Sequence, residues 1–379
     1  MKTIKKIAAE TDLKGKYVIV RSSLNVPMED GQVVNQFRIA RALPTLLHLS
    51  GVGARVILIA HAGRDPRVTL KPVCDILSES LPTVWCGSLT GDEVKEKRDA
   101  LKDGEVLMLE NLRSDEREVA NDKSLAKELA DLADIYVCDA FAVAHREHTS
   151  VVGIPKLLPS YAGINFLMEF EELKRTIKPE HPSIFILGGA KFDTKMPLVE
   201  KFLNSYDHIF IGGALANDFF KAKGFEVGKS VTSAITLTDS PLLENEKIIL
   251  PVDVVVDGPG GQRIVTPESV TPNDVIHDIG PQSISMLSIY TKGAKTILWN
   301  GPLGNYEMKY DEGTVAFAKQ VAASEAYSVV GGGDTVASIE SLGISGKFGF
   351  LSTGGGAMLS FLEQGTLPAI EALKDGAKK

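Results

Sequence analysis

The sequence contains few cysteines, no excess of positive charge and no long apolar run. Its three cysteines, Cys74, Cys86 and Cys138, lack the spacing of a metal site, and an odd, sparse count favours a reducing compartment. The net charge of −8 argues against broad binding to nucleic acid or anionic membranes, which requires a positive surface. No apolar run reaches about 18 residues, and the lysine-rich N-terminus has no apolar signal core. We therefore expect a cytoplasmic protein without a membrane span.

Two common nucleotide-binding signatures are also missing. No Gly-x-Gly-x-x-Gly motif follows an expected strand, which weakens the case for a nicotinamide-dependent enzyme. The stretch from Gly224 to Ser230 resembles a Walker loop but is one residue too short. The composition, with 44% hydrophobic and 24% charged residues, is that of an ordinary globular protein.

Short segments rich in Val and Ile alternate with longer segments of helical periodicity. Strands are expected at 17–20, 56–59, 105–109, 135–137, 184–187, 208–211, 296–299 and 328–330, and helices at 39–49, 122–132, 165–176 and 314–324. Such alternation is typical of βαβ units, in which helices cover both faces of a parallel sheet. At about 150 residues per domain, 379 residues predict two domains, each able to bury its own core.

The best candidate for a domain boundary lies near the middle of the chain. Residues 154–163 are punctuated by Pro and Gly, and an amphipathic helical pattern follows over 166–176. A further Pro-containing stretch at 179–182 then precedes the next strand. We therefore expect the helix to connect the two domains.

Arginine is concentrated in the first of these domains. Ten of the twelve arginines precede residue 150. Random drift and solvated faces account for about half of them. The remainder indicate an anion site in the N-terminal half, because the guanidinium fork suits carboxylate and phosphate.

Glycine clusters mark the second domain. Pairs or triplets of glycine lie at 188–189, 212–213, 331–333 and 354–356, each between a strand and a helical pattern. Glycine lets a backbone approach phosphate closely, and a helix N-terminus offers free N–H groups, so four clusters favour a nucleotide site. The simpler explanation of each one is a tight turn that uses glycine for its conformation only.

Charged side chains beside these glycines strengthen the nucleotide interpretation. Lys191 and Lys195 follow the first cluster at helical spacing, and an anion between them would offset the repulsion of two like charges. Asp334, after the third cluster, is a reasonable Mg²⁺ ligand, because Mg²⁺ prefers one or two carboxylates plus substrate oxygens. The alternatives are a solvated lysine pair and a helix N-cap at Asp334.

Six segments resemble the phosphoglycerate kinase family and occur in that family's order over nearly the full chain. They are LENLRS around Arg113, DAFAVAHREHTS around Arg146, ILGGAK ending at Lys191, WNGPLGNYE ending at Glu307, GGGDT ending at Thr335 and STGGGA ending at Ala357. The resemblance implies an α/β fold of two doubly wound, Rossmann-like parallel-sheet domains that face each other across a cleft and are joined by a connecting helix. It also implies that residues 1–163, with 362–379 packing back on them, bind 3-phosphoglycerate. Residues 164–361, which include the connecting helix, would bind the nucleotide.

Position by position, the resemblance implies two sets of site residues. The acid would be bound by Arg21, Ser23, Asn25, Arg38, His61, Arg64, Arg113 and Arg146, with Arg38 next to the transferring phosphoryl group. The nucleotide would be bound by Gly189, Lys191, Lys195, Gly212, Gly213, Asn300, Glu307, Gly333, Asp334 and Thr335, with Asp334 as the Mg²⁺ ligand. The implied catalytic residues are Arg38, Lys191 and the helix start formed by Gly354, Gly355 and Gly356.

The activity that the resemblance implies is reversible phosphoryl transfer between 1,3-bisphosphoglycerate and ADP, giving 3-phosphoglycerate and ATP in glycolysis and gluconeogenesis, by a monomeric enzyme. The nucleophile of the ATP-consuming direction is a carboxylate that is already ionised at pH 7, so no general base is expected. Catalysis then depends on positioning and on neutralising charge. Ser23 and Thr194 stand where the family usually has Asp. These changes leave open a nucleotide-binding paralogue with weak kinase activity, or a kinase acting on a different acid.

Overall fold

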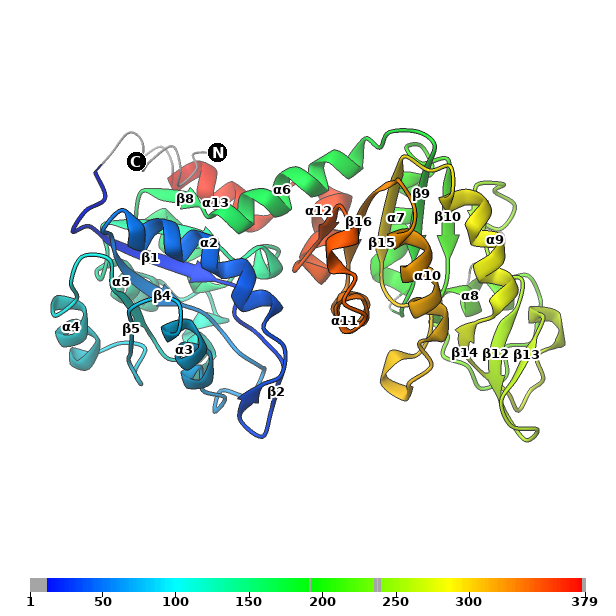
Figure 1. The fold of residues 1–379 in the computed structure, drawn as a ribbon, viewed down its shortest axis with the longest axis horizontal. Coiled ribbons are helices and arrows are strands. Elements are labelled where there is room, and N and C mark those ends of the chain that lie inside the picture. Colours follow the sequence, from blue (N-terminus) through cyan, green and yellow to red (C-terminus); the bar gives the residue numbers. More distant parts are fainter. Residues whose placement is uncertain (1–11, 191, 235–236, 238–239, 377–379) are drawn as a thin grey trace. The chain divides into compact units, whose positions relative to one another are not determined.

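The computed structural model describes residues 12–376 except 191, 235–236 and 238–239, and the chain divides into two compact units (Figure 1). The first unit comprises the described residues up to Glu171 together with those from Thr366 onward. The second unit runs from Glu172 to Gly365. The division therefore falls within helix α6 (Ile164–Ile177), whereas the sequence places the boundary just before that helix.

The first unit is built on a six-stranded sheet with the order β5-β6-β4-β1-β7-β8, in which every pairing is parallel. Its strands are β1 (Tyr17–Ser22), β4 (Arg55–Ile59), β5 (Thr83–Trp85), β6 (Val106–Met108), β7 (Ile135–Asp139) and β8 (Ser160–Ala162). A short antiparallel hairpin, β2 (Met28–Glu29) and β3 (Gln32–Val33), follows β1. Because β1 is paired on both sides and buried on both faces, its first four residues form a continuous apolar run rather than an alternating pattern.

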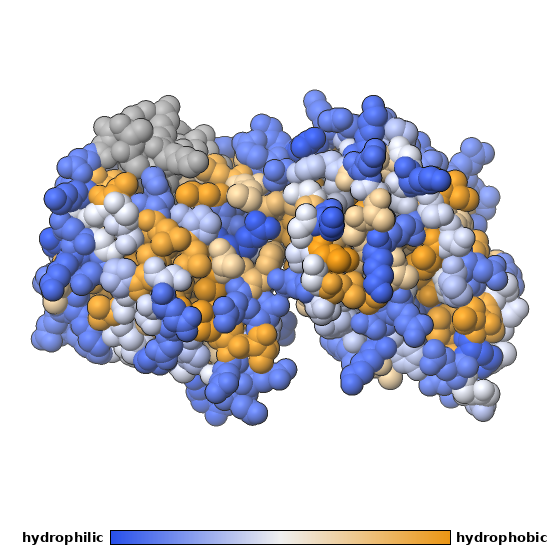
Figure 2. All heavy atoms as spheres, in the orientation of Figure 1, coloured by the Kyte–Doolittle hydropathy of each residue, from blue (hydrophilic) through white to orange (hydrophobic). Residues whose placement is uncertain are grey.

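Helices pack on this sheet through one face each. They are α2 (Phe37–Gly51), α3 (Lys71–Ser78), α4 (Asp92–Asp99), α5 (Lys123–Ala130) and α13 (Pro368–Gly376), with shorter turns η1 (Leu112–Ser114), η2 (Glu116–Glu118), η3 (Phe141–Val143), η4 (Thr149–Gly153) and η5 (Ile154–Lys156). In α2 the buried side chains include Ile39, Ala42 and Leu46, which recur at helical spacing. In α4 only Val94 is buried, and Figure 2 shows mostly hydrophilic side chains around that helix, at the left edge of the view.

The last described helix returns to the first unit. α13 packs against η4, η5 and β8, and the backbone N–H of Ala369 donates to the carbonyl oxygen of Ala144 at 3.0 Å. The sequence places the start of this return at residue 362. Residues up to 364 instead complete α12 (Gly355–Gln364) in the second unit, so the return begins at Thr366.

The second unit contains another six-stranded parallel sheet, with the order β11-β10-β9-β15-β16-β17. Its strands are β9 (Ser183–Leu187), β10 (His208–Ile211), β11 (Ile248–Ile249), β15 (Thr296–Asn300), β16 (Tyr327–Gly331) and β17 (Phe350–Leu351). Its remaining helices are α7 (Phe192–Phe202), α8 (Ala214–Ala222), α9 (Pro281–Thr291), α10 (Glu312–Ala322) and α11 (Gly333–Ser341), with short turns η6 (Pro267–Ser269), η7 (Tyr306–Met308) and η8 (Ser345–Lys347). A separate antiparallel sheet, in the order β13-β12-β14, is formed by β12 (Val254–Asp257), β13 (Arg263–Val265) and β14 (Val275–Ile279).

The two doubly wound parallel sheets confirm the predicted fold class. Each of the eight expected strands and four expected helices overlaps an element of the structure. Phe141 and Trp299 are among the large side chains that are fully buried. Among the described residues, no helix combines the length and the apolar character that crossing a membrane requires.

Candidate active site

The predicted acid-binding residues of the first unit gather where its central strands end. Arg21 is the second-last residue of β1. His61 follows β4, Arg113 follows β6, and Arg146 follows β7. These strands are parallel neighbours, so their carboxyl ends meet at one edge of the sheet. The fold thus brings together residues that are up to 125 positions apart in the sequence, counted from 146 back to 21.

Arg21 is a buried cation held by three hydrogen bonds. Its side chain is 1% exposed, and its Nε donates to Ser150 Oγ at 3.0 Å. One terminal nitrogen donates to Nδ1 of His61 at 2.9 Å, and the other donates to the carbonyl oxygen of Ser22. Burial lowers the pKa of Arg21, but a guanidinium remains charged in proteins. The first unit therefore keeps a fixed positive charge at the end of β1.

His61 is neutral at physiological pH. Burial lowers its pKa well below the ordinary value, and nearby positive charges lower it further; these belong to Arg21, Arg113, Arg38 and Arg146. Because Arg21 donates to Nδ1, that atom must carry a lone pair, and the ring proton lies on Nε2. His61 is thus a neutral hydrogen-bond donor surrounded by cations.

The loop after β4 is tied to the neighbouring segments of the site. Asn25 Oδ1 accepts from the N–H of Gly63 at 2.7 Å, and the carbonyl oxygen of Asn25 accepts from Arg38 Nη1 at 2.9 Å. Arg113 donates to the carbonyl oxygen of Gly63. Arg64, in the same loop, is exposed. The pKa of Arg113 is lowered mainly by burial and by the charges of other arginines, and the charge of Arg64 makes a smaller contribution in the same direction. These contacts place Asn25, Arg38 and Arg113 around one short loop.

Asn111, which the site prediction omitted, holds this loop in place through hydrogen bonds to its backbone. It is fully buried, and its Oδ1 accepts from the N–H of Ala62 at 3.2 Å and of Arg113 at 3.0 Å. Its Nδ2 donates to the carbonyl oxygens of Ala62 and Val68, both at 2.8 Å. The available signal was an Asn in LENLRS, three residues after the end of buried strand β6, because a buried amide needs several hydrogen-bond partners.

The resulting cluster has the chemistry of an anion site. Positive charges that depress one another's pKa are relieved when an anion binds between them. The Oγ atoms of Ser22 and Ser23 lie at the end of β1, buried and without a hydrogen-bond partner in the part of the chain that the structure describes. Two buried hydroxyl groups at the end of β1 thus lack a hydrogen-bond partner within the described chain.

In the second unit, glycines bring three turns into close contact. The N–H of Gly188 donates to the carbonyl oxygen of Asn300, and that of Gly189 donates to Pro302. Gly213 has φ +58° and ψ −155°, a conformation essentially reserved for glycine, and a Cβ there would lie 2.5 Å from the nitrogen of Gly189. These glycines are therefore required by backbone packing, whether or not a phosphate binds nearby.

A cavity of about 290 Å³ lies beside these turns. Four of the predicted nucleotide residues line it, namely Gly189, Gly213, Glu307 and Asp334. The prediction omitted other lining residues, among them Asn217, Phe220, His277 and Tyr306. Their apolar and aromatic surfaces suit a flat ring system, which is the usual character of a small-molecule pocket.

Five predicted nucleotide residues that the structure describes are not part of the cavity wall, namely Lys195, Gly212, Asn300, Gly333 and Thr335. Gly212 faces Leu303, whose Cδ2 would be 2.9 Å from an added Cβ. Asn300 is buried, with its Nδ2 3.7 Å from the sulfur of Met358. Thr335 Oγ1 is buried without a partner in the described chain, one residue after Asp334, and Gly333 begins α11.

The predicted lysines follow the first glycine turn. Lys191 lies outside the described residues, and α7 begins at the next position. Lys195 is buried, and its Nζ donates to the carbonyl oxygen of Gly188. This places one ammonium group directly at the Gly188–Gly189 turn. Gly354, Gly355 and Gly356 form the start of α12, where the N–H of Gly354 donates to Ser352 Oγ at 3.0 Å.

Asp334 and Glu307 form a pair of carboxylates that could hold a metal ion. Both line the cavity, and the pKa of Asp334 is raised by burial and then by the charge of Glu307. A divalent cation would relieve this repulsion, so these residues fit Mg²⁺, which binds one or two carboxylates together with phosphate oxygens. Within the described ranges, no group of three or more His, Cys, Asp or Glu is arranged to hold a metal on its own.

Comparison with known proteins gives a consistent result over the whole chain. The family model described as phosphoglycerate kinase matches residues 8–365. The chain is 41% identical to a phosphoglycerate kinase of Leptospira biflexa, covering 96% of this chain and 97% of that protein, and 42% identical to one of Thermus thermophilus, covering 96% and 98%. Among solved structures, phosphoglycerate kinase from Pyrococcus horikoshii matches with a TM-score of 0.87 and 33% identity, covering both chains completely. The enzyme from Coxiella burnetii matches with a TM-score of 0.80 and 36% identity, covering 97% of this chain and 98% of that one.

Proposed function

The chain belongs to the phosphoglycerate kinase family, and on that basis we propose that it transfers a phosphoryl group reversibly between 1,3-bisphosphoglycerate and ADP. The products are 3-phosphoglycerate and ATP. The full-length similarity does not favour the alternative of a nucleotide-binding paralogue with little kinase activity.

The observation that carries this proposal is the group of arginines around a neutral histidine at the edge of the first sheet. Arg21, Arg38, Arg113 and Arg146 all act electrostatically on His61. A small acid with a phosphate at one end and a carboxylate at the other matches such a site, because guanidinium groups bind both anions through paired hydrogen bonds. The cavity of the second unit, with its glycine turns and carboxylate pair, supports a nucleotide as the second substrate.

The residues of the site would act by positioning and by neutralising charge. No general base is required, because the attacking carboxylate of 3-phosphoglycerate is already ionised. Lys195 would neutralise nucleotide phosphate at the first glycine turn, and the free N–H groups that begin α12 would stabilise the moving phosphoryl group. Mg²⁺ held by Asp334 would neutralise charge on the phosphate oxygens. Arg38 would hold the transferring group on the side of the acid.

Two further features complete the proposal. We propose that the enzyme works in the cytoplasm and as a monomer. Size-exclusion chromatography with light scattering tests the monomer, and a mass near 82 kDa, about twice that of the 40.8 kDa chain, would contradict it.

A coupled assay with several small phosphorylated acids tests the function. We expect ATP-dependent turnover with 3-phosphoglycerate and Mg²⁺, and far less with other acids. In a folded Arg38→Ala variant, turnover should fall by about a hundredfold or more. The matched control is Arg67→Ala, which removes an arginine that pairs with Asp65 at the surface, and it should keep wild-type turnover. Turnover with a different acid, or none with any acid, would reject the proposal.

A further inference from the structure

Glu118 is a buried carboxylate behind the arginine cluster, and the proposed chemistry gives it no role. Its side chain is 1% exposed. Both carboxylate oxygens accept hydrogen bonds from one residue: Oε1 from Ser150 Oγ at 2.6 Å, and Oε2 from the N–H of Ser150 at 2.8 Å. Burial raises the pKa of Glu118, while the charge of Arg21 and the bonds from Ser150 act in the opposite direction. Two accepted bonds and a nearby cation favour the ionised form.

The direction of each hydrogen bond from Glu118 to His61 is fixed by chemistry. A guanidinium can only donate, so Arg21 Nε donates to Ser150 Oγ, at 3.0 Å. The hydroxyl proton of Ser150 must then point to Glu118, which accepts it. At the other end of Arg21, the terminal nitrogen donates to His61 Nδ1 at 2.9 Å. One continuous chain of hydrogen bonds therefore joins a carboxylate to the lone pair of a histidine ring.

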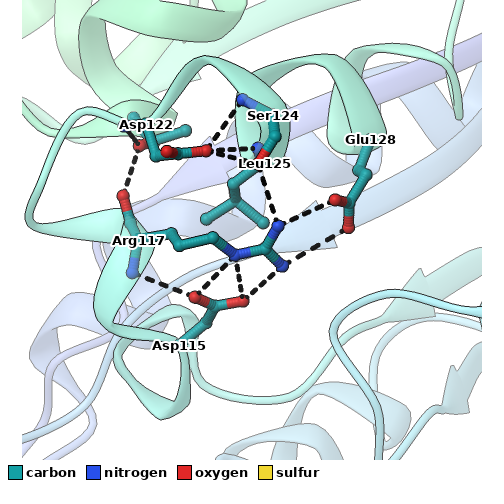
Figure 3. A network of polar contacts seen from close by, with 7 residues as sticks. Asp115, Arg117, Asp122, Ser124, Leu125 and Glu128 are labelled. Carbon is teal, nitrogen blue, oxygen red and sulfur yellow. Dashed lines mark hydrogen bonds and ion pairs between the residues drawn. The ribbon is translucent and has the colours of Figure 1, made fainter.

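The two segments that carry Glu118 and Ser150 are joined again on their outer side. Figure 3 shows the guanidinium of Arg117 between the carboxylates of Asp115 and Glu128, with bonds of 2.7 Å and 2.8 Å as the shortest to each. The hydroxyl of Thr149 donates to the carbonyl oxygen of Arg117 at 2.7 Å. Glu118 thus follows Arg117, and Ser150 follows Thr149, and these two preceding residues are hydrogen-bonded to each other.

The imidazole ring of His148 also lies close to Glu118. Its Nδ1 lies 3.8 Å from Glu118 Oε1, which is beyond hydrogen-bond length. Burial, followed by the charge of Arg146, lowers the pKa of His148 to about 4, so this ring is neutral at pH 7. The polarity of the hydrogen-bond chain therefore depends on Glu118 rather than on His148.

We propose that Glu118, acting through Ser150, is a positioning residue that orients Arg21 and thereby keeps the ring proton of His61 on Nε2. The proposal rests on the proposed function, because the Nε2–H group is useful as a donor to an anionic acid. Without the carboxylate, the Ser150 hydroxyl has no strong acceptor and is no longer held in the orientation in which its oxygen accepts from Arg21 Nε. His61 then samples the other tautomer, whose Nε2 lone pair repels an anion.

The test uses three variants of the full chain. Glu118→Gln keeps the shape but places an NH₂ group where an acceptor is needed, and Ser150→Ala removes the hydroxyl while keeping its N–H on Glu118. Glu128→Gln is the matched control, because it makes the same chemical change in the exposed part of the Arg117 network.

Nitrogen-15 NMR of histidine-labelled protein reports the tautomer of His61, with assignment from a His61→Gln variant. We expect an Nε2-protonated ring in the wild type and in Glu128→Gln, and a mixture of tautomers in Glu118→Gln and Ser150→Ala. The KM for 3-phosphoglycerate should rise about tenfold or more in both of these variants, while the KM for ATP stays unchanged.

An unaltered His61 tautomer in both Glu118→Gln and Ser150→Ala would overturn the proposal. An equal rise in both KM values would also overturn it, because that result indicates general damage to the fold. If Glu118→Gln does not fold, the His61 tautomer in Ser150→Ala alone decides whether the proposal holds. The NMR measurement needs no substrate, so failure of the proposed function, seen as a wild type inactive with 3-phosphoglycerate, remains distinguishable from failure of this proposal.

Discussion

The ammonium group of Lys201 donates a hydrogen bond of 2.7 Å to the carbonyl oxygen of Leu362. Lys201 lies in the last turn of α7, and Leu362 lies in the last turn of α12. A second bond of the same length reaches the carbonyl oxygen of Glu363. Because the C-terminal carbonyl groups of a helix lack partners and carry partial negative charge, this cation caps α12 at the end opposite its glycine-rich start.

Replacing Lys201 by Met should therefore destabilise the second unit. The variant leaves two carbonyl groups without their charged donor, and we expect a loss of about 1–2 kcal/mol. Urea unfolding measures it. The control is Lys127→Met, whose ammonium makes an exposed ion pair with Asp131 four residues away and should cost less than about 0.5 kcal/mol. Equal losses in the two variants would show that the cap adds nothing.

Gly213→Ala should damage both the fold and nucleotide binding. An added Cβ would lie 2.5 Å from the nitrogen of Gly189 and 2.9 Å from its carbonyl oxygen, in a backbone conformation that other residues avoid. We expect a loss of about 3 kcal/mol or more in urea unfolding, and weak ATP binding by calorimetry.

The matched control for this prediction is Gly224→Ala. Gly224 also has a positive φ, +83°, but nothing lies within 4 Å of its added Cβ. This variant should lose only about 1 kcal/mol from backbone strain and should bind ATP normally. If both variants lost the same stability, the close approach of Gly213 to Gly189 would not be the cause.

The Asp334→Asn variant tests whether Asp334 binds the metal ion rather than the nucleotide itself. The affinity for Mg-ATP should fall about tenfold or more, because the amide binds the cation weakly. The affinity for ATP without Mg²⁺ should not fall, since the variant removes a negative charge from the cavity. Calorimetry with each ligand gives the comparison, with Glu312→Gln, an exposed carboxylate, as the control. Equal weakening with and without Mg²⁺ would exclude Asp334 as the ligand.

His148 should make stability depend on pH below neutrality. Its pKa is about 4 in the folded protein, mainly because of burial, against an ordinary value of 6.5. Unfolding therefore takes up a proton between these values, and the free energy of unfolding decreases as the pH falls from about 6.5 toward 4. Between pH 7 and pH 5, the wild type should lose about 2 kcal/mol more than a His148→Gln variant. Parallel losses in urea unfolding at the two pH values would contradict this assignment.

The parallel sheets were predictable because their strands carry a strong local signal. β1 and β15 are buried on both faces, so uninterrupted apolar runs at 17–20 and 297–299 mark them in the sequence. The small antiparallel sheet was not predicted, although β12 contains three consecutive valines. Its partner β13 has only three residues, none of them buried, β14 contains the polar residues His277 and Asp278, and local composition does not reveal which strands will pair.

The same holds for the site: residues that follow strands could be recognised from the sequence, but contacts between distant residues could not. Arginines and glycines after strands are visible in the sequence, and the parallel topology brings the arginines to one edge of their sheet. Glu118 and Ser150 are ordinary polar residues in the sequence, 32 positions apart, and only folding buries them against each other. Gly212 stays a predicted site residue, and the structure adds a packing reason for its lack of a side chain, since an added Cβ would lie 2.9 Å from Leu303 Cδ2.

The return of α13 to the first unit has a consequence for synthesis on the ribosome. The second unit is an uninterrupted stretch from Glu172 to Gly365, whereas the first unit needs residues that precede and residues that follow this stretch. Translation proceeds from the N-terminus, so the early strands of the first unit must wait for α13 before their packing is finished. The second unit can thus finish folding before the first, and β8 stays uncovered by α13 until residues 368–376 have been synthesised.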